Sequence, residues 1–345
     1  MSEPWTCSDV GSFAWRTCTQ RWPTIVDGLR RDVPAFDAPL QSLRDELVAG
    51  TVLPLGDDVG EAPRWSKAHE FAGQPWTAMP WYFAEAFLYA RIRALVHHEE
   101  TRADPFLATK QREERALPPI SSSDDVDDAL WRSLWGNRAD LSLPSAMKHS
   151  GSDANDLVAD EREAARAMIE GAGNIAILLD NAGVELACDL SLARLLVRRG
   201  KRVTLLAKDA PFFVSDATAA DVARTRVLLG LQEDADVVDD FFFTGPGFLR
   251  SDELPPALRE RLAAFDLVIA KGDCNYRRLV RDVPPDDDAF ADVVSFPAPV
   301  IALRTLKAEV LVGADPTRVA RAKARDDDWL VSGRYGLVQV STVRR

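Results

Sequence analysis

Cysteine and histidine are scarce in this sequence, and neither is spaced for metal binding. The 345 residues include four cysteines and four histidines, and no CxxC pair occurs. This scatter argues against a disulfide framework or a structural zinc site, so free thiols are expected. No apolar run approaches the roughly 20 residues of a membrane span, and the start, MSEPWTCSDV, lacks the basic and apolar regions of a secretory leader. The sequence therefore predicts a cytoplasmic protein with no membrane partner.

Positive charge is also in short supply. There are 42 basic against 54 acidic residues, a formal net charge of -12. Such a chain repels polyphosphate backbones, so nucleic acid is not expected as a partner. A phosphorylated small molecule would be repelled at long range as well, and it would need local cations or a bound metal. These totals direct attention to local clusters of charge.

The two halves of the chain differ in kind. Eight of nine tryptophans and all four histidines precede residue 150, and residues 81–98 have helical spacing of apolar positions. From residue 174 short apolar runs alternate with amphipathic helices over 184–200 and 216–230, which is typical of a parallel sheet covered by helices. The predicted strands lie in 174–180, 201–208, 266–273, 299–307, 309–313 and 335–341. We expect a helical N-terminal domain (1–165) and a Rossmann-like α/β/α sandwich with a mainly parallel sheet (166–345).

Polar residues follow several of these strands. Asp180 and Asn181 end the first strand, and Asp216 lies beyond the second, which ends in Lys208. Because the carboxyl ends of parallel strands meet at one edge, these side chains should converge there. Two carboxylates and an amide oxygen favour a hard divalent ion such as Mg²⁺ or Mn²⁺. Alternatively, DNAG is only a strand-to-helix turn and Ser215 or Asp216 an N-cap, but their joint placement favours the metal site.

Two later segments carry groups suited to anions. KGDCNYRRL follows an apolar strand with a glycine, an acid, an amide and cations, a setting that can hold a phosphate or polyol. Its candidates are Asp273, Asn275, Tyr276 and Arg277. A surface helix start with ordinary salt bridges is an equally good interpretation. In RTLK, Arg304 and Lys307 suit two cations that converge on one anion, with a solvated pair as the alternative.

Four segments together resemble a known family. LLDNAGVEL, PFFVSDAT, AKGDCNYRRL and RTLK, in this order, are similar to the DUF89 family of damage-control phosphatases. The RTxK motif is that of its third subfamily, the acidic residue methyltransferase 1-like proteins. WYFAEAFLYARI, ADPFLATKQ and LWGNRADLSL resemble the helical N-terminal part of that subfamily. The resemblance therefore covers most of the chain.

The resemblance implies a helical domain packed on a Rossmann-like domain, and a divalent metal (Mn²⁺, Ni²⁺, Co²⁺ or Mg²⁺) held by Asp180, Asn181 and Asp216. It implies phosphate-ester hydrolysis, with fructose 1-phosphate and fructose 6-phosphate among the substrates. Asp180 and Asn181 would also contact the substrate, and Lys307 would bind its phosphate. Asp273 through Arg277 would line the pocket, including Cys274, where relatives often carry Leu. Glu85 shares a helical face with Tyr82 and Tyr89 and could reach the site, or be a buried structural Glu.

The preferred hypothesis is a metal-dependent phosphatase with Asp180, Asn181, Asp216 and Lys307 as catalytic residues and Arg304 among the substrate-binding ones. Either a water molecule or the Asp180 carboxylate could be the nucleophile, because both chemistries need an aspartate here. One rival is an AdoMet-dependent protein carboxyl methyltransferase. Its candidate glycine loop, GAG at 171–173, precedes a strand, whereas such a loop should follow one. The other rival is a non-catalytic sugar-phosphate-binding protein.

Overall fold

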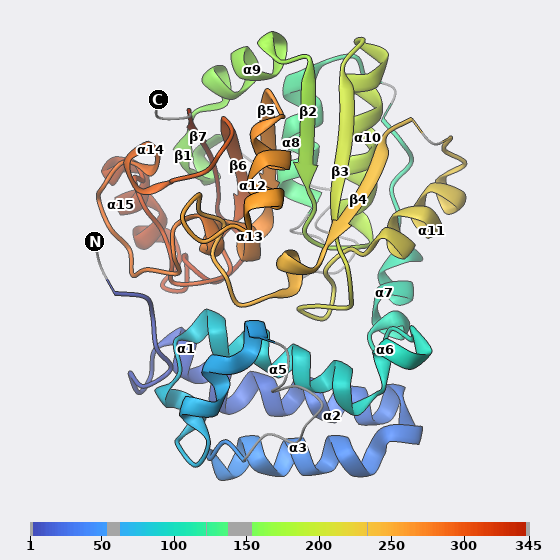
Figure 1. Cartoon of the computed structure of the whole chain (residues 1–345). Helices are drawn as coiled ribbons and strands as arrows, with labels where there is room; N and C mark the ends of the chain where they lie inside the picture. The colour runs from blue at the N-terminus through green and yellow to red at the C-terminus, as the bar shows by residue number, and fades with distance from the viewer. Residues whose placement is uncertain (1–2, 54–62, 122, 137–153, 233, 343–345) are drawn as a thin grey trace.

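The N-terminal part of the chain is helical, as predicted. The computed structural model describes residues 3–53, 63–121, 123–136, 154–232 and 234–342; residues 137–143 of the LWGNRADLSL segment lie outside them. In Figure 1 the blue and cyan helices form a layer against one end of the sheet domain. The helical elements are α1 (Phe13–Arg16), the π-helix η1 (Thr17–Arg21), α2 (Trp22–Asp32), η2 (Pro34–Phe36), α3 (Asp37–Ala49), η3 (Pro63–Phe71), η4 (Trp76–Ala78), α5 (Trp81–Leu95), α6 (His98–Thr101), α7 (Leu107–Glu114), α8 (Val126–Gly136) and η7 (Ala154–Asp156).

A seven-stranded sheet forms the rest of the molecule, in the order β1-β7-β6-β5-β2-β3-β4. Neighbouring strands are parallel except β6 and β7, which are antiparallel. The strands are β1 (Leu157–Asp160), β2 (Asn174–Leu178), β3 (Arg202–Lys208), β4 (Asp236–Asp240), β5 (Leu267–Lys271), β6 (Val300–Thr305) and β7 (Gly336–Ser341). Between them lie α9 (Arg162–Gly171), α10 (Val184–Arg198), α11 (Ala219–Leu229), η8 (Phe241–Thr244), α12 (Pro256–Ala263), α13 (Gly272–Leu279), α14 (Phe290–Val293) and α15 (Pro316–Arg325).

Each face of the sheet has its own apolar core, because successive strand residues point to opposite faces. Ile175, Ile177 and Ile269 pack on one face with residues of α8 to α11. Ala176 and Leu178 pack on the other with α12 to α15 and with the N-terminal helices. The mainly parallel α/β/α architecture expected from the sequence is therefore confirmed.

The sheet domain begins earlier in the chain than the boundary expected after residue 165. β1 pairs with β7, and α8 packs against α10, so both belong to the sheet domain although they precede that boundary. β4, with the sequence DVVDD, was missed because its acidic residues break the apolar run. The strand expected in 309–313 is wrong, since that segment forms no strand.

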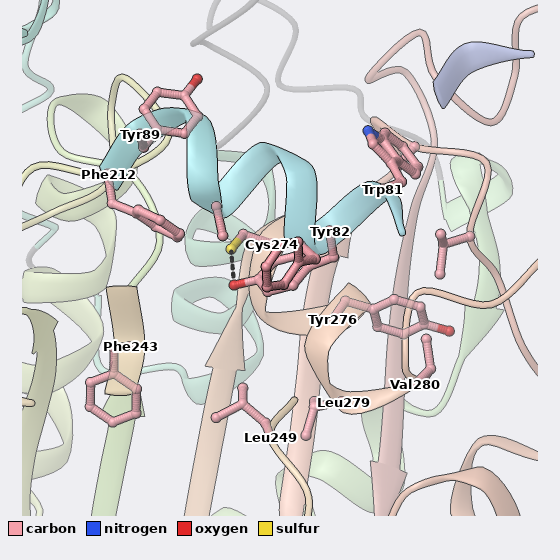
Figure 2. Close-up of a cluster of buried hydrophobic side chains, with 14 of the residues drawn as sticks. Trp81, Tyr82, Tyr89, Phe212, Phe243, Leu249, Cys274, Tyr276, Leu279 and Val280 are labelled. Carbon is pink, nitrogen blue, oxygen red and sulfur yellow. Dashed lines mark hydrogen bonds between the residues drawn. The ribbon is translucent and has the colours of Figure 1, made fainter. Parts of the chain in front are cut away.

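Aromatic side chains of α5 join the two halves in one core. Tyr89 stacks on Phe213, with ring centroids 5.1 Å apart. The Tyr82 hydroxyl lies 4.0 Å from the Cys274 Sγ, as the dashed line in Figure 2 shows. The helical layer is therefore fixed against the loop after β3 and against α13. Among the helices that the structure describes, none combines the length and the hydrophobicity of a transmembrane segment.

Candidate active site

The predicted site lies where the winding of the sheet reverses. β2 lies between β5 and β3. The chain leaves β2 for β3 on one side, and it leaves β5 for β6 on the other. A crevice opens at such a switch point, outside the carboxyl ends of the strands. Asp180 follows β2, and Gly272 and Asp273 follow β5, so the sequence places its polar residues at this crevice.

A short β-bridge joins the loops that follow β2 and β3. Asn181 and Asp216 form an isolated antiparallel bridge. The Ala217 N–H donates to the Asp180 carbonyl at 2.7 Å, and the Ala182 N–H donates to the Ser215 carbonyl at 2.7 Å. The bridge brings together side chains that are 35 residues apart in the chain. The N-cap of α11 is Thr218, so the alternative view of Ser215 or Asp216 as that cap is wrong.

The Asn181 side chain is held in one orientation. Its Nδ2 donates to Asp180 Oδ2 at 3.0 Å and to Glu185 Oε2 at 2.9 Å, and its Oδ1 accepts from the Ser215 hydroxyl at 2.6 Å. The amide N–H groups thus donate to two carboxylates, so Oδ1 is the atom of this side chain that could bind a metal. Sequence reasoning missed Glu185. Its signal was the spacing of four residues from Asn181 at the start of a helix.

Burial gives the two aspartates unusual proton affinities. Burial raises the pKa of Asp180 well above its ordinary value, and the nearby Glu185 and Asp216 carboxylates raise it further. Burial also raises the pKa of Asp216 to about 6, against the pull of Lys208, whose Nζ lies 3.2 Å from Asp216 Oδ2. A cluster of buried acids with raised pKa values is stabilised by a cation placed among them.

A cavity of about 80 Å³ opens beside these residues, which is room for several water molecules. Both halves of the chain line it. Of the eleven residues predicted for the site, eight line this cavity: Glu85, Asp180, Asn181, Asp216, Asp273, Cys274, Arg277 and Lys307. Phe13, Arg21, Trp81, Phe213, Ser215 and Ala308 complete it and were not predicted.

The other three predicted residues lie behind the cavity wall. Arg304 is 1% exposed and pairs with Asp273 at 2.7 Å, so it does not converge with Lys307 on the cavity as expected. The Tyr276 hydroxyl bonds to the Gln339 side chain at 3.0 Å. Asn275 Nδ2 donates to the carbonyls of Leu179 and Lys271, tying the ends of β2 and β5 together. The side chains of all three residues are therefore held by hydrogen bonds or an ion pair within the fold.

Glu85 and Arg277 form a buried ion pair across the two halves. The Arg277 Nη1 lies 2.7 Å from Glu85 Oε2, and its Nε lies 2.6 Å from Asp282 Oδ1. The guanidinium also lies 3.8 Å from the centroid of the Trp81 ring. Glu85 thus both lines the cavity and has a structural partner. The idea that KGDCNYRRL is a surface helix start is wrong, because most of α13 is buried.

A second buried network of polar side chains, centred on Lys271, contacts the site through Glu185. Lys271 Nζ lies 3.0 Å from Glu185 Oε1 and 3.2 Å from Asp189 Oδ1, and it donates to the Ser133 carbonyl at 2.6 Å. Burial raises the pKa of Asp189 to about 7, although Lys271 opposes the shift. Through Glu185 this network reaches Asn181. A fixed second layer of this kind orients metal-ligand side chains.

The donor set fits a hard divalent cation. No three His, Cys, Asp or Glu side chains form a metal-binding group among residues 3–53, 63–121, 123–136, 154–232 and 234–342, so a metal held by the predicted residues would use the amide oxygen of Asn181 beside the two aspartates. Gly272 (φ 76°) leaves room for this arrangement, because a Cβ there would overlap the Asp180 carboxylate. An oxygen-only set with fixed orientation suits Mg²⁺ or Mn²⁺.

The candidate methyltransferase loop lies on the wrong side of its strand. Residues 171–173 end before β2 begins at Asn174. The segment that follows β2 is instead the one that carries Asp180 and Asn181. This order counts against nucleotide binding by the glycine loop.

The fold and the site define a class of α/β proteins that have, at the switch point of the sheet, a cavity lined by acidic and basic side chains. A family comparison makes this specific. The family model of the damage-control phosphatase ARMT1-like domain matches residues 17–321. The chain belongs to this family.

Individual relatives agree with this assignment. The damage-control phosphatase ARMT1 of Xenopus tropicalis is 28% identical, over 96% of this chain and 97% of the relative. Its counterpart in Rattus norvegicus is 27% identical over 97% of each chain. A DUF89 family protein of Pyrococcus horikoshii has a similar fold, with a TM-score of 0.54, 16% identity and coverage of 94% and 98%. Family membership supports a phosphatase acting on small phosphorylated metabolites.

Proposed function

We propose that this protein is a metal-dependent phosphatase of small sugar phosphates similar to fructose 1-phosphate and fructose 6-phosphate. The observation that carries the proposal is the bridge between Asn181 and Asp216, which supports a metal site formed by Asp180, Asn181 and Asp216 at a cavity that Lys307 also lines. Membership in a family of damage-control phosphatases supports phosphate-ester hydrolysis as the reaction. The choice of fructose phosphates comes from the family resemblance of the sequence, and the oxygen ligands and hydroxyl-binding acids of the cavity support a metal and a sugar phosphate.

Asp180, Asn181 and Asp216 would hold a divalent cation. When bound, such a cation supplies Lewis-acid polarisation of the phosphate and activation of the nucleophile. Glu85, Asp180, Asp216 and Asp273 are four carboxylates on one small cavity. Three of them already pair with Arg277, Lys208 and Arg304, and a cation held beside Asp180 and Asp216 would further favour the approach of a dianionic phosphate.

The chain's own residues bind and orient the substrate in this proposal. Lys307 contacts the phosphate, where its ammonium offsets charge that builds on the phosphoryl oxygens. Arg304 fixes Asp273, whose Oδ1 also accepts from the Lys307 backbone N–H at 3.2 Å. Asp273 thereby positions the segment that carries Lys307.

The remaining acids suit hydroxyl groups. Glu85 uses Oε2 for Arg277, and Asp273 uses Oδ1 for Arg304. Each residue also lines the cavity, so its second carboxylate oxygen can accept a hydrogen bond from a sugar hydroxyl. Carboxylates and hydroxyls form strong charge-assisted bonds, which favours a polyol phosphate over an apolar phosphate ester.

A panel of phosphate esters tests the proposal. Purified protein would be incubated with each ester, including both fructose phosphates, in the presence of Mn²⁺, Ni²⁺, Co²⁺ or Mg²⁺, and with EDTA as control. We expect metal-dependent phosphate release that is lost in Asp216→Asn and kept in Asp315→Asn, which changes an exposed cap of α15. Absence of release with every ion, or binding of sugar phosphate without turnover, would contradict the proposal.

A further inference from the structure

A single π-turn brings an arginine from the helical half to the active-site cavity. α1, η1 and α2 follow one another without a break, and Arg21 is the last residue of the π-helix η1. Pro23 has no N–H, so it cannot donate to the carbonyl four residues before it. The Trp22 N–H, which would donate to the Cys18 carbonyl in a regular α-helix, donates to the Thr17 carbonyl, five residues back. One-turn π-helices of this kind are frequent at functional sites.

The π-turn decides where Arg21 lies. An inserted helical residue shifts all following side chains around the helix by about 100°. In this register Arg21 lines the cavity with Asp180, Asp216 and Lys307, whereas Thr17 and Cys18 of the same turn are buried. A regular helix through this stretch would turn the arginine to a different side.

The positive charge of Arg21 is not neutralised by an ion pair with any residue that the structure describes. Arg277, the other arginine of the cavity, is shared between Glu85 and Asp282. Arg21 is exposed. Across the part of the chain that the structure describes, no ion pair or hydrogen bond engages its guanidinium. An exposed arginine is ordinary on a protein surface, but this one faces a cavity with four carboxylates and lacks a carboxylate partner among the described residues.

We propose that Arg21 binds the phosphoryl group of the substrate, which rests on the proposed phosphatase function. The divalent cation would offset part of the acidic charge, and Lys307 would contact the phosphate from the sheet half. Arg21 would add two N–H donors from the helical half, in the planar geometry that matches a phosphate. Substrate binding would thus require both halves of the chain.

The test compares two variants that each remove one positive charge from an exposed arginine of the helical half. Arg21→Gln removes the proposed contact, and Arg31→Gln removes an exposed arginine of α2 outside this cavity. With wild-type protein, Mn²⁺ and the best ester of the panel, we expect Arg21→Gln to raise both KM and the inhibition constant of inorganic phosphate by about 10- to 100-fold. Arg31→Gln should leave both within about two-fold, the size expected of a screened surface charge.

Two further measurements separate binding from a structural role. Arg21→Lys should recover part of the phosphate affinity, and added guanidinium ion at millimolar concentration should partly restore Arg21→Ala. The melting temperature of each variant should match wild type, because no hydrogen bond or ion pair joins the Arg21 side chain to the residues that the structure describes. Equal inhibition constants for phosphate in Arg21→Gln and Arg31→Gln would overturn the inference. Lack of turnover by wild-type protein would instead overturn the proposed function itself.

Discussion

Gly272 and Asp180 lie so close that the space for the Asp180 carboxylate depends on the missing side chain of Gly272. Gly272 begins α13 with φ 76°, and a Cβ there would lie 2.6 Å from Asp180 Cβ and overlap the carboxylate. Gly272→Ala therefore adds a left-handed alanine, which costs about 1–2 kcal/mol, and an overpacked contact, which costs about 1–3 kcal/mol. Asp180 must move to make room.

Gly200→Ala is the matched control. Gly200 has φ 79°, and a Cβ at this position would meet no atom within 4 Å, so this variant carries the backbone strain without the clash. In urea unfolding at one pH we expect Gly200→Ala to lose about 1–2 kcal/mol and Gly272→Ala to lose more. For kcat/KM, a displacement of Asp180 by about 1 Å predicts a loss near 100-fold in Gly272→Ala only.

The outcome depends on the position of one carboxylate. If Gly272→Ala kept the kcat/KM of Gly200→Ala, Asp180 would not have to lie against Gly272 for turnover. The assignment of Asp180 as a metal ligand would then fail. Equal losses of stability in the two variants would show that the site relaxes around the new methyl group without cost.

Three further outcomes follow from contacts around the site. Lys271→Met should destabilise the protein by about 3–5 kcal/mol in urea unfolding, because it leaves Glu185 and Asp189 buried without their cation; a change below 1 kcal/mol would contradict this. The pKa of Asp189 is raised to about 7 in the folded state, so the folded state holds its proton more tightly and this group's contribution to stability falls as pH rises from about 4 to 7. The free energy of unfolding of Asp189→Asn should therefore increase relative to that of wild type as pH rises through that window. A difference between the two proteins that stays constant from pH 4 to 8 would refute the raised pKa. Tyr276→Phe should cost about 1 kcal/mol of stability through the lost bond to Gln339 but leave KM unchanged, whereas a raised KM would return Tyr276 to the substrate.

Local pattern was enough to find the sheet and its functional edge. Apolar runs such as NIAILL and DLVIA have no polar alternation, and they became β2 and β5, which are buried on both faces. The polar residues after them could be assigned to one edge because parallel strands end together. β4 escaped the same reasoning because an edge strand with acidic residues carries no apolar run.

Side-chain direction was harder to predict than position. Arg304 and Lys307 are three residues apart, yet one is buried against Asp273 and the other lines the cavity. Their separation in the sequence cannot say which, because the chain leaves the strand after Thr305. Arg21 was missed for a similar reason: its direction depends on a π-turn, and the only local sign of that turn is Pro23.

The position of Asp216 is a property of both halves of the chain. The turn before it places two successive non-glycine residues, Phe213 (φ 44°) and Val214 (φ 67°), in the left-handed region, at a cost of order 1–3 kcal/mol each. α5 supplies contacts that offset this cost: Tyr89 stacks on Phe213, and Arg93 Nη1 donates to the Pro211 carbonyl at 3.0 Å. Without α5 the strained turn would lose both of these contacts, and the bridge to Asn181 would have to hold Asp216 without them. The helical layer is therefore part of the proposed metal site, although it provides none of the ligands.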